Sequence, residues 1–433
     1  MNYARLNHIL IPTTKDDRDR WRKTAWSRFL FGPLTSTWFA LSDEGRILLG
    51  FSLVAGLAGI DVERSETHAL WALLFSLILS SLVARRAFRL SDVRFEVAGP
   101  GRVAVGAPAH FQLTLHNRGD RPHFGIRVER PFLPWDGTWE RRAPRLAEVP
   151  ARQHRNVAAI ARFRSRGAHH IDAFSAAALV PLGLALGPAT QSTGIRFTVV
   201  PRVAHVRMSS LANSGCHQPG GVALASHTGE SMELIGVRPY RPGDALRDLH
   251  AVTWARTGEP SVREYRQEYF TRVGVILDTD PAGASEPRFE AGISLVAGIV
   301  AGLCGGEEVI DLLVTGERMR SFTLGRGLGQ LDQALDQLAE VEPGVFDAEA
   351  LMSALQPYLE RLSAVVFVAF EWDERRLALV RAIQRRGVAC RTVIVTDSRR
   401  ATRRSEPADS AGVVQFDVDE VNAACIAGEE LVL

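Results

Sequence analysis

The chain has 433 residues, 46% hydrophobic and 23% charged, which is long enough for two or three domains and typical of a folded protein. Its formal net charge of +2 argues against a dedicated nucleic-acid binder, because such proteins carry a clear excess of basic residues. The cysteines argue against a zinc site or a disulfide scaffold and fit a reducing compartment, because no two of them form a CxxC pair. They are Cys216, Cys304, Cys390 and Cys425.

Residues 1–46 are mostly polar and hold no apolar run of the kind found in a secretory signal peptide. They predict a cytoplasmic N-terminal leader with partial amphipathic character at residues 21–31. A cleavable signal peptide is therefore not expected.

Two apolar runs follow, at residues 47–60 and 69–84, and a short polar stretch joins them. Each run is slightly shorter than the roughly 17–25 residues of a membrane-spanning helix, so a pair of buried core helices is the alternative. Both runs are nearly apolar all round, which favours contact with lipid over a helix with a single core-facing side. We therefore predict a transmembrane helical hairpin at residues 47–84.

Small residues stand four positions apart in each run. Ser52 and Gly56 form the pair in the first run, and Ser76 and Ser80 form the pair in the second. This spacing suits close contact between two helices in lipid.

The charges beside the hairpin predict its orientation. Arg46 precedes the first run, and Arg85, Arg86 and Arg89 follow the second. The joining loop contains a single arginine, Arg64. The positive-inside rule then places both outer ends of the hairpin in the cytoplasm. The prediction is a protein of the inner (cytoplasmic) membrane with two spans, in contact with membrane lipid, whose soluble domains lie in the cytoplasm.

From residue 92 the hydrophobic pattern changes to a period of two, which is typical of half-buried antiparallel strands. Phe111 and Leu113, for example, alternate with polar neighbours. Several short strands separated by turn-forming clusters predict a small antiparallel β-sandwich at residues 92–203. The adjacent His169 and His170 would point to opposite faces of a strand, which does not favour a metal site.

Residues 204–271 are predicted to join the β-domain to a C-terminal domain, and the densest mixed charge of the chain lies at residues 238–268. Gly243, after a proline, predicts a tight turn. Asp244 can cap a short helix that follows the turn, and residues 261–265 predict a strand that leads into the next domain.

The arginines of this joining segment allow two interpretations. They can form an anion-binding pocket, because guanidinium groups bind oxyanions in a bidentate manner. They can instead pair with neighbouring acids in a salt-bridge network, which dense mixed charge favours. The candidate motif and partner-binding residues are Arg238, Tyr240, Gly243, Asp244, Arg247, Arg256, Arg263 and Glu264.

After residue 272, short apolar strands alternate with segments of helical spacing. This alternation predicts a parallel sheet covered on both faces, so we expect an α/β doubly wound domain at residues 272–433. The predicted strands are residues 273–278, 309–314, 364–370 and 388–395, and the predicted helices are residues 289–303, 328–338, 348–362 and 375–386.

In such a sheet, ligand sites form at the carboxyl ends of the strands. Asp278, Asp280 and Asp373 are the candidate metal ligands there, and Mg²⁺ is the possible cofactor, because carboxylate oxygens suit a hard cation. The arrangement resembles the von Willebrand factor A fold, whose metal-ion-dependent adhesion site begins Asp-x-Ser-x-Ser. The run Asp-Thr-Asp-Pro-Ala that starts at Asp278 has an acid and an alanine at the serine positions, so the site is degenerate. A structural role for the acids is the favoured alternative.

The sequence contains no GxxxxGK[ST] nucleotide loop, no HExxH zinc motif and no GxSxG nucleophile elbow. Cys216 and His217 are adjacent in the sequence, but no third residue can be assigned to orient them. The sequence therefore names no catalytic residue.

The charged joining segment resembles one known family. Residues 238–256 are similar to R-x-Y-x-x-G-D-x-x-R-x-I-x-W-x-x-x-A-R, the hallmark of the domain-of-unknown-function family fifty-eight, and Val-Arg-Glu follows at residues 262–264. The chain departs from the hallmark at Ala251, where the family has tryptophan. Trp254, three residues later, is expected to compensate by packing nearby.

The resemblance covers most of the chain from about residue 40, including Pro-Leu-Gly-Leu at residues 181–184 and Val-Pro-Arg at residues 200–202. It implies a membrane anchor and a von Willebrand factor A-like C-terminal domain. Because members of the family are often encoded beside MoxR-type AAA ATPases, it also implies such an ATPase as a partner. It implies no reaction.

We therefore predict a non-enzymatic, membrane-anchored scaffold or adaptor that acts with a cytoplasmic MoxR-type AAA ATPase in the assembly or maturation of client complexes. The alternative is a divalent-metal-dependent binding protein or hydrolase that uses the degenerate site at Asp278, Asp280 and Asp373. An anion or nucleic-acid binder that uses the motif arginines is the weakest hypothesis, because the net charge is close to zero.

Overall fold

The computed structural model divides into two compact units, Met1–Pro201 and Arg202–Leu433. Residues 1–36 of the predicted leader, and Cys216 with His217, lie outside the described part of the chain. The structure describes residues 37–38, 40–58, 65–208, 232–244, 246–267, 272–281, 283–306, 308–315, 319–324, 328–397 and 413–433.

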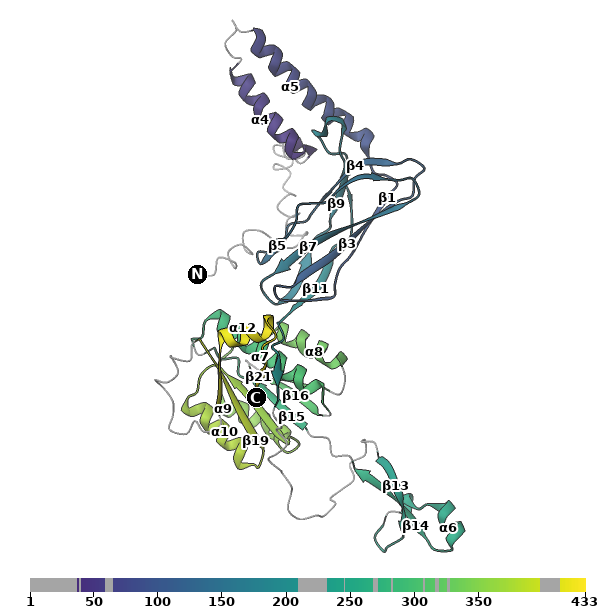
Figure 1. Ribbon diagram of the computed structural model, residues 1–433, viewed down its shortest axis with the longest axis vertical. Coiled ribbons are helices and arrows are strands. Elements are labelled where there is room, and N and C mark those ends of the chain that lie inside the picture. The colour runs from purple at the N-terminus through teal and green to yellow at the C-terminus, as the bar shows by residue number, and fades with distance from the viewer. Residues whose placement is uncertain are drawn as a thin grey trace. The chain divides into compact units, whose positions relative to one another are not determined.

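In the described part of the first unit, two apolar helices run side by side, α4 (Asp43–Ala58) and α5 (Ser65–Ala84), and the 3₁₀ turn η1 (Arg85–Phe88) follows (Figure 1). Large apolar side chains cover their outer surfaces, and Val83 is 72% exposed. Among the described residues, the segments Glu66–Phe88 and Glu286–Cys304 are long and apolar enough to cross a membrane. The second segment is mostly buried inside the other unit, so only the first has the exposed apolar surface expected in lipid.

The contact between α4 and α5 uses only one of the two predicted pairs of small residues. Ser52 is buried, and Gly56 lies so close to the indole of Trp71 that a Cβ atom would stand 2.8 Å from its Nε1. On α5 the predicted pair is wrong, because Ser76 and Ser80 are exposed and their hydroxyls donate to carbonyls of their own helix. The buried residues of α5 are instead Ile78 and Ser81.

Short, mostly antiparallel strands form the rest of the first unit, in sheets of order β1-β3-β7-β5, β10-β9-β4-β6 and β2-β11-β8. The predicted period-two pattern is confirmed in β3, where buried and solvent-facing residues alternate. Phe111, Phe163, Phe174 and Phe197 pack in its core. The strands are β1 (Val93–Ala98), β2 (Arg102–Ala104), β3 (Pro108–Asn117), β4 (His123–Glu129), β5 (Gly137–Trp139), β6 (Arg145–Val149), β7 (His154–Phe163), β8 (Gly167–Ile171), β9 (Ser175–Ala178), β10 (Thr190–Gln191) and β11 (Ile195–Val200).

In the second unit, the charged joining segment forms a small substructure that we call the motif arm, residues 232–267. Its strands β13 (Met232–Pro239) and β14 (Ser261–Gln267) pair antiparallel; β14 contains the strand predicted at residues 261–265, whereas its pairing with β13 was not predicted. Between them lie the 3₁₀ turn η4 (Leu246–Asp248) and the helix α6 (Ala251–Thr257), which has no buried residue.

The remainder of the second unit is an α/β domain around a six-stranded sheet of order β17-β16-β15-β18-β19-β20. Alternate residues of β18, such as Val365 and Phe367, belong to the core shared with α9 and α10, whereas α7, α8 and α12 pack together on the other side of the sheet (Figure 1). The bounds are β15 (Arg272–Leu277), α7 (Glu286–Cys304), β16 (Val309–Val314), β17 (Arg320–Leu324), α8 (Leu328–Ala339), α9 (Ala348–Leu359), β18 (Ala364–Ala369), α10 (Glu374–Arg385), β19 (Ala389–Thr396), β20 (Val413–Asp417) and α12 (Val418–Ile426).

The predicted strands and helices of this domain agree with the structure within a few residues, and five of its strands pair in parallel. The sequence did not predict the antiparallel edge strand β17 or the last pair, β20 and α12. It also assigned the stretch from residue 204 to the joining segment, whereas β12 (Val206–Arg207) pairs with β21 (Leu431–Val432) beside the α/β sheet.

Candidate functional site

The carboxyl ends of the adjacent strands β15 and β18 bring the predicted metal ligands together. Asp278 directly follows β15, and Asp280 stands two residues further along. Asp373, in the loop after β18, begins α10, where its carboxylate accepts a hydrogen bond from the backbone N–H of Arg376. Because these strands are parallel neighbours, three carboxylates that are distant in sequence meet at one edge of the sheet.

The guanidinium group of Arg376 lies at the centre of these carboxylates. Its Nε donates to Oδ2 of Asp278 at 2.7 Å, its Nη1 donates to Oδ2 of Asp373 at 3.0 Å, and its Nη2 donates to Oδ2 of Asp280 at 3.3 Å. The Arg376 side chain is 2% exposed and that of Asp278 is fully buried. Each guanidinium nitrogen therefore has its own carboxylate, and we call these four residues the arginine–carboxylate centre.

The loop before α9 covers this centre. Phe346 places its ring 4.5 Å from the Arg376 guanidinium carbon, a cation–π contact, and its backbone N–H donates to Asp280 at 3.3 Å. The backbone N–H of Asp280 in turn donates to Oδ1 of Asp278 at 2.9 Å. The remaining acceptor of Asp278 is thus satisfied inside the protein, whereas the side chains of Asp280 and Asp373 are 27% and 34% exposed.

Burial and pairing act in opposite directions on the charges of this centre. Burial raises the pKa of Asp278 to about 6, against the lowering effect of Arg376. For Arg376, burial disfavours the charge, but Asp278 and its neighbouring carboxylates outweigh burial and raise the pKa of the guanidinium. At neutral pH the centre therefore holds a buried ion pair between Arg376 and an ionised Asp278.

This geometry bears directly on the predicted magnesium site. A divalent cation needs several free oxygen ligands around an open position, and here the guanidinium takes that position. Among the described residues, no group of three or more acidic, histidine or cysteine side chains is arranged to hold a metal ion. A resident Mg²⁺ does not fit between Asp278, Asp280 and Asp373, because the guanidinium of Arg376 already binds all three carboxylates.

The other polar residues at the strand ends have local roles. The hydroxyl of Thr279 donates to the carbonyl of Thr315 at 2.8 Å, and the backbone N–H of Thr279 donates to the Thr315 hydroxyl at 2.7 Å, so these side chains join β15 to β16. Glu371 is solvent-exposed. Sequence reasoning missed Arg376, and its only signal was an arginine three residues after the candidate metal ligand Asp373.

The motif arm contains one well-defined ion pair. Arg238 binds the carboxylate of Asp244 with both terminal nitrogens, at 2.7 and 2.8 Å, and the same carboxylate accepts from the backbone N–H of Arg241 at 2.8 Å. The hydrogen bond from Arg238 lowers the pKa of Asp244. Asp244 therefore fixes the turn at Gly243, whose φ of 110° is poorly tolerated by other residues, and α6 is capped by His250 instead.

Most other predicted residues of the arm face solvent. Arg247, Arg256 and Arg263 are exposed, and Arg247 is 3.9 Å from Asp248. Tyr240 is half-buried, and its backbone N–H donates to the carbonyl of Pro260. The side chain of Glu264 lies outside the described part of the structure.

Apolar side chains share the surface of the arm with these arginines. Leu246 is 72% exposed, Val252 is 68% exposed and Trp254 is 44% exposed. The expectation that Trp254 packs in place of the absent tryptophan at Ala251 is not met, because α6 buries no residue. A two-stranded ribbon with one short helix has little core of its own, so this apolar surface suits a partner.

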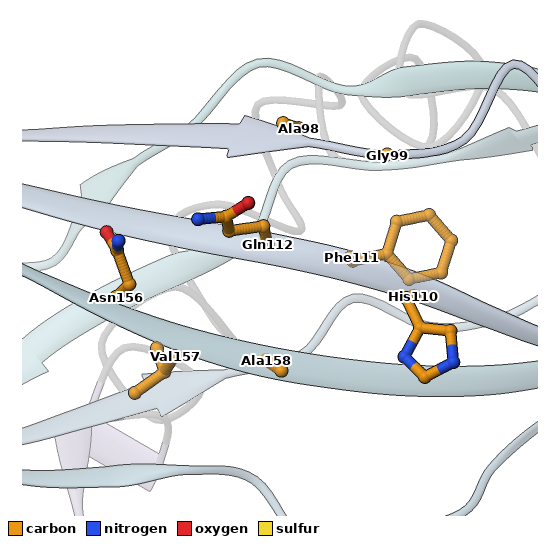
Figure 2. Close-up of a pocket in the computed structure, with 8 residues that line it drawn as sticks. All are labelled: Ala98, Gly99, His110, Phe111, Gln112, Asn156, Val157 and Ala158. Carbon is orange, nitrogen blue, oxygen red and sulfur yellow. The ribbon is translucent and has the colours of Figure 1, made fainter.

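The first unit has a shallow cavity of about 510 Å³ over β1, β3 and β7 (Figure 2). Figure 2 shows His110, Gln112 and Asn156 among its lining residues. His110 is the one titratable side chain in that lining, so the cavity contains no pair of groups for acid–base or nucleophilic chemistry.

The two adjacent histidines of β8 lie in different environments, as predicted for neighbours on a strand. Nε2 of His169 lies 2.9 Å from Oδ2 of the buried Asp136, whereas His170 is more exposed and 3.4 Å from Asp172. Burial disfavours both charges of the first pair, but the hydrogen bond between them raises the pKa of His169 and lowers that of Asp136. This pair joins β8 to the loop before β5 and is structural.

Comparisons with known proteins add little. No family model and no curated protein matches the chain. Native alpha-2-macroglobulin from Escherichia coli, from domain MG7 to the C-terminus, matches 28% of this chain and 18% of its own length, at 17% identity and a TM-score of 0.22. The CARDB domain of the PF1109 protein from Pyrococcus furiosus, in complex with di-metal ions, matches 25% of this chain and 88% of its own, at 12% identity and a TM-score of 0.18. Scores this low support no inference about this chain.

Proposed function

We propose that the protein is a non-enzymatic scaffold or adaptor, anchored in the inner membrane by α4 and α5, that acts with a cytoplasmic MoxR-type AAA ATPase in the assembly or maturation of client complexes. The observation that carries the proposal is the motif arm, which displays Leu246, Val252 and Trp254 beside exposed arginines. Clustered aromatic and arginine side chains are typical of the residues that dominate protein–protein binding.

The membrane part of the proposal rests on the helical pair. α5 is apolar all round and largely exposed, as a helix in lipid would be. The arginines at the two outer ends of the pair, Arg46 near the start of α4 and Arg85 and Arg86 after α5, favour the cytoplasm for both ends. The β-sandwich and the α/β domain then lie on the side where an ATPase acts.

The non-enzymatic part rests on the arginine–carboxylate centre. The carboxyl edge of a parallel sheet is where an α/β protein most often builds a reactive site. In this domain the guanidinium of Arg376 pairs with all three carboxylates there, and the ring of Phe346 lies against that guanidinium. We further propose that the domain is a von Willebrand factor A-like module in which the internal ion pair replaces the metal, so that partner binding moves from the strand ends to the motif arm.

The proposal is tested by affinity capture of the tagged full chain from detergent-solubilised membranes of its own host, with mass spectrometry of the captured proteins. We expect a MoxR-type ATPase to be captured with the wild-type chain and to be reduced several-fold by Arg247→Ala. Arg320→Ala is the matched control, because Arg320 is an exposed arginine of the α/β domain outside the arm. Capture of no AAA ATPase by the wild-type chain would reject the proposal.

A further inference from the structure

The first unit displays one leucine in a costly conformation. Leu182 has a φ of 72°, in the left-handed region that a side chain disfavours, and it is 71% exposed. The left-handed backbone is costly for a leucine, and the exposed side chain gains no burial within the β-domain that would offset this cost. Leu182 belongs to the loop Pro181–Gly183, between β9 and β10.

This loop is tied to the start of α4. The hydroxyl of Ser42 donates to the carbonyl of Gly183 at 2.5 Å, and the backbone N–H of Ser42 donates to the carbonyl of Leu184 at 3.0 Å. Gly45 lies against the Leu184 carbonyl so closely that a Cβ atom there would collide with it. Leu182 is therefore held beside the first turn of α4, immediately before its exposed apolar stretch begins at Ile47.

The stretch between this loop and β10 contacts η1, the turn that follows α5. Gly187 lies directly against the carbonyl of Phe88, the last residue of η1, with no room for a Cβ atom. A cavity of about 690 Å³ opens beside this contact, and its lining includes Arg89, Arg121, Phe124 and Pro181. Phe124 is 60% exposed, so a second large apolar side chain is displayed where the apolar helices meet the β-domain.

The segments that contact residues 183–187 carry arginine and tryptophan side chains of the kind found at membrane interfaces. Arg86 is exposed at the end of α5, and the guanidinium carbon of Arg46 lies 5.4 Å from the ring of the exposed Trp38. Tryptophan and arginine are the residues that anchor proteins at the level of lipid headgroups. The acids of the cavity, Asp92 and Asp120, offset Arg89 and Arg121, so displayed apolar surface distinguishes this region more than net charge does.

We propose that the loop at Leu182 and the side chain of Phe124 form a second membrane contact, which inserts into the headgroup region of the bilayer that holds α4 and α5. This inference rests on the proposed membrane anchoring and adds to it. The partner of this contact is the lipid surface, because Ser42, Gly45 and Gly187 join the loop directly to the ends of the apolar helices. The contact holds the β-sandwich at the membrane surface, so that the β-sandwich does not move freely relative to α4 and α5.

The test places a fluorescent probe at single positions of the full chain in nanodiscs of phosphatidylethanolamine and phosphatidylglycerol, with or without lipids brominated on the acyl chain near the headgroup. In a background in which the four native cysteines are replaced by alanine, Leu182→Cys, Val83→Cys and Phe132→Cys are labelled with bimane. Val83 reports the apolar helix, and Phe132 is an exposed residue beyond the opposite end of β4 from Phe124.

We expect bromine to quench the probes at Leu182 and Val83 to a similar extent and to leave the probe at Phe132 unchanged. Quenching at Val83 together with no quenching at Leu182 would overturn the second contact and leave the membrane anchor intact. If neither Val83 nor Leu182 is quenched, the anchoring itself fails, and the inference fails with it. Equal quenching at all three positions would also overturn it, because Leu182 would then be no closer to lipid than the rest of the β-domain.

Discussion

The Nε atom of Arg376 lies 2.7 Å from Oδ2 of Asp278, and both side chains are buried at the carboxyl edge of the central sheet. An isolated buried charge is very costly, so each of these groups depends on the other. At the edge of the sheet where an α/β protein could bind a metal, this protein therefore has an internal ion pair.

We predict that Arg376→Ala destabilises the α/β domain by about 3–5 kcal/mol, because the variant leaves Asp278 buried without its cation. The measurement is chemical denaturation in detergent of a full chain whose other tryptophans are replaced by phenylalanine, followed by the fluorescence of Trp372, which is buried in this domain. Arg207→Ala serves as the control, since Arg207, whose side chain is 63% exposed, pairs with Glu430 at 3.3 Å and should cost at most about 1 kcal/mol. Equal losses in the two variants would contradict the importance of the buried pair.

We also predict that Arg376→Ser gains divalent-metal binding that the wild-type chain lacks. The smaller side chain leaves Asp278, Asp280 and Asp373 around an open position, and carboxylate oxygens are the preferred ligands of Mg²⁺ and Mn²⁺. Isothermal titration calorimetry with Mn²⁺ measures the difference, and thermal unfolding with and without the ion supplies a second readout. Tight binding of the ion by the wild-type chain would support the metal-dependent alternative and contradict our interpretation of Arg376.

The pair of His169 and Asp136 should stabilise the first unit most at mildly acidic pH. The pKa of His169 is raised in the folded state, so its contribution is complete below its unfolded value and is lost as pH rises through the folded value. The pKa of Asp136 is lowered, so its contribution is present above its unfolded value and is lost as pH falls through the folded value. The pair therefore contributes most between about pH 4 and 6.5.

His169→Gln should remove this dependence. We expect the difference in unfolding midpoint between wild type and variant to be largest near pH 5–6 and to shrink towards pH 8.5. His170→Gln is the control, because His170 is more exposed and pairs only at 3.4 Å with Asp172. A difference between His169→Gln and wild type that stays constant across this pH range would contradict the assignment.

Leu182→Gly should not destabilise the chain in detergent. Glycine relieves a left-handed conformation that costs a leucine about 1–2 kcal/mol, and this gain offsets the extra backbone entropy of the unfolded state. The measurement is thermal unfolding, compared with Leu184→Gly, whose side chain is buried and whose loss should cost about 2–5 kcal/mol. A loss of that size in Leu182→Gly would show that Leu182 stabilises the β-domain itself and is not free for the membrane.

The sequence predicted the parts of this structure whose hydrophobic period is clear. The alternation around Phe111 marked the β-domain, and the apolar strands before Asp278 and Asp373 marked the parallel sheet. The short edge strand β17 was missed, because five residues with mixed character give little periodic signal.

The arginine–carboxylate centre could be predicted only in part. The three acids follow from the rule that strand ends meet, but the sequence around Arg376 has the pattern of an ordinary amphipathic helix with arginines on its polar side. Only the cap at Asp373, which begins α10 against the strand ends, turns this particular arginine inward. Likewise, nothing in the sequence indicates that Ser76 and Ser80 face away from α4, because the rotation of a uniformly apolar helix has no periodic marker.

The central claim is that the motif arm binds an AAA ATPase at the membrane, and photo-crosslinking in the host's own membranes tests it most directly. Trp254 is replaced by p-benzoylphenylalanine, and Val345, an exposed residue of the α/β domain outside the arm, is replaced in a parallel chain. The account predicts an ultraviolet-dependent adduct between the Trp254 position and a MoxR-type ATPase, and none from the Val345 position. The absence of an ATPase adduct at Trp254, or adducts of equal yield at both positions, would contradict it.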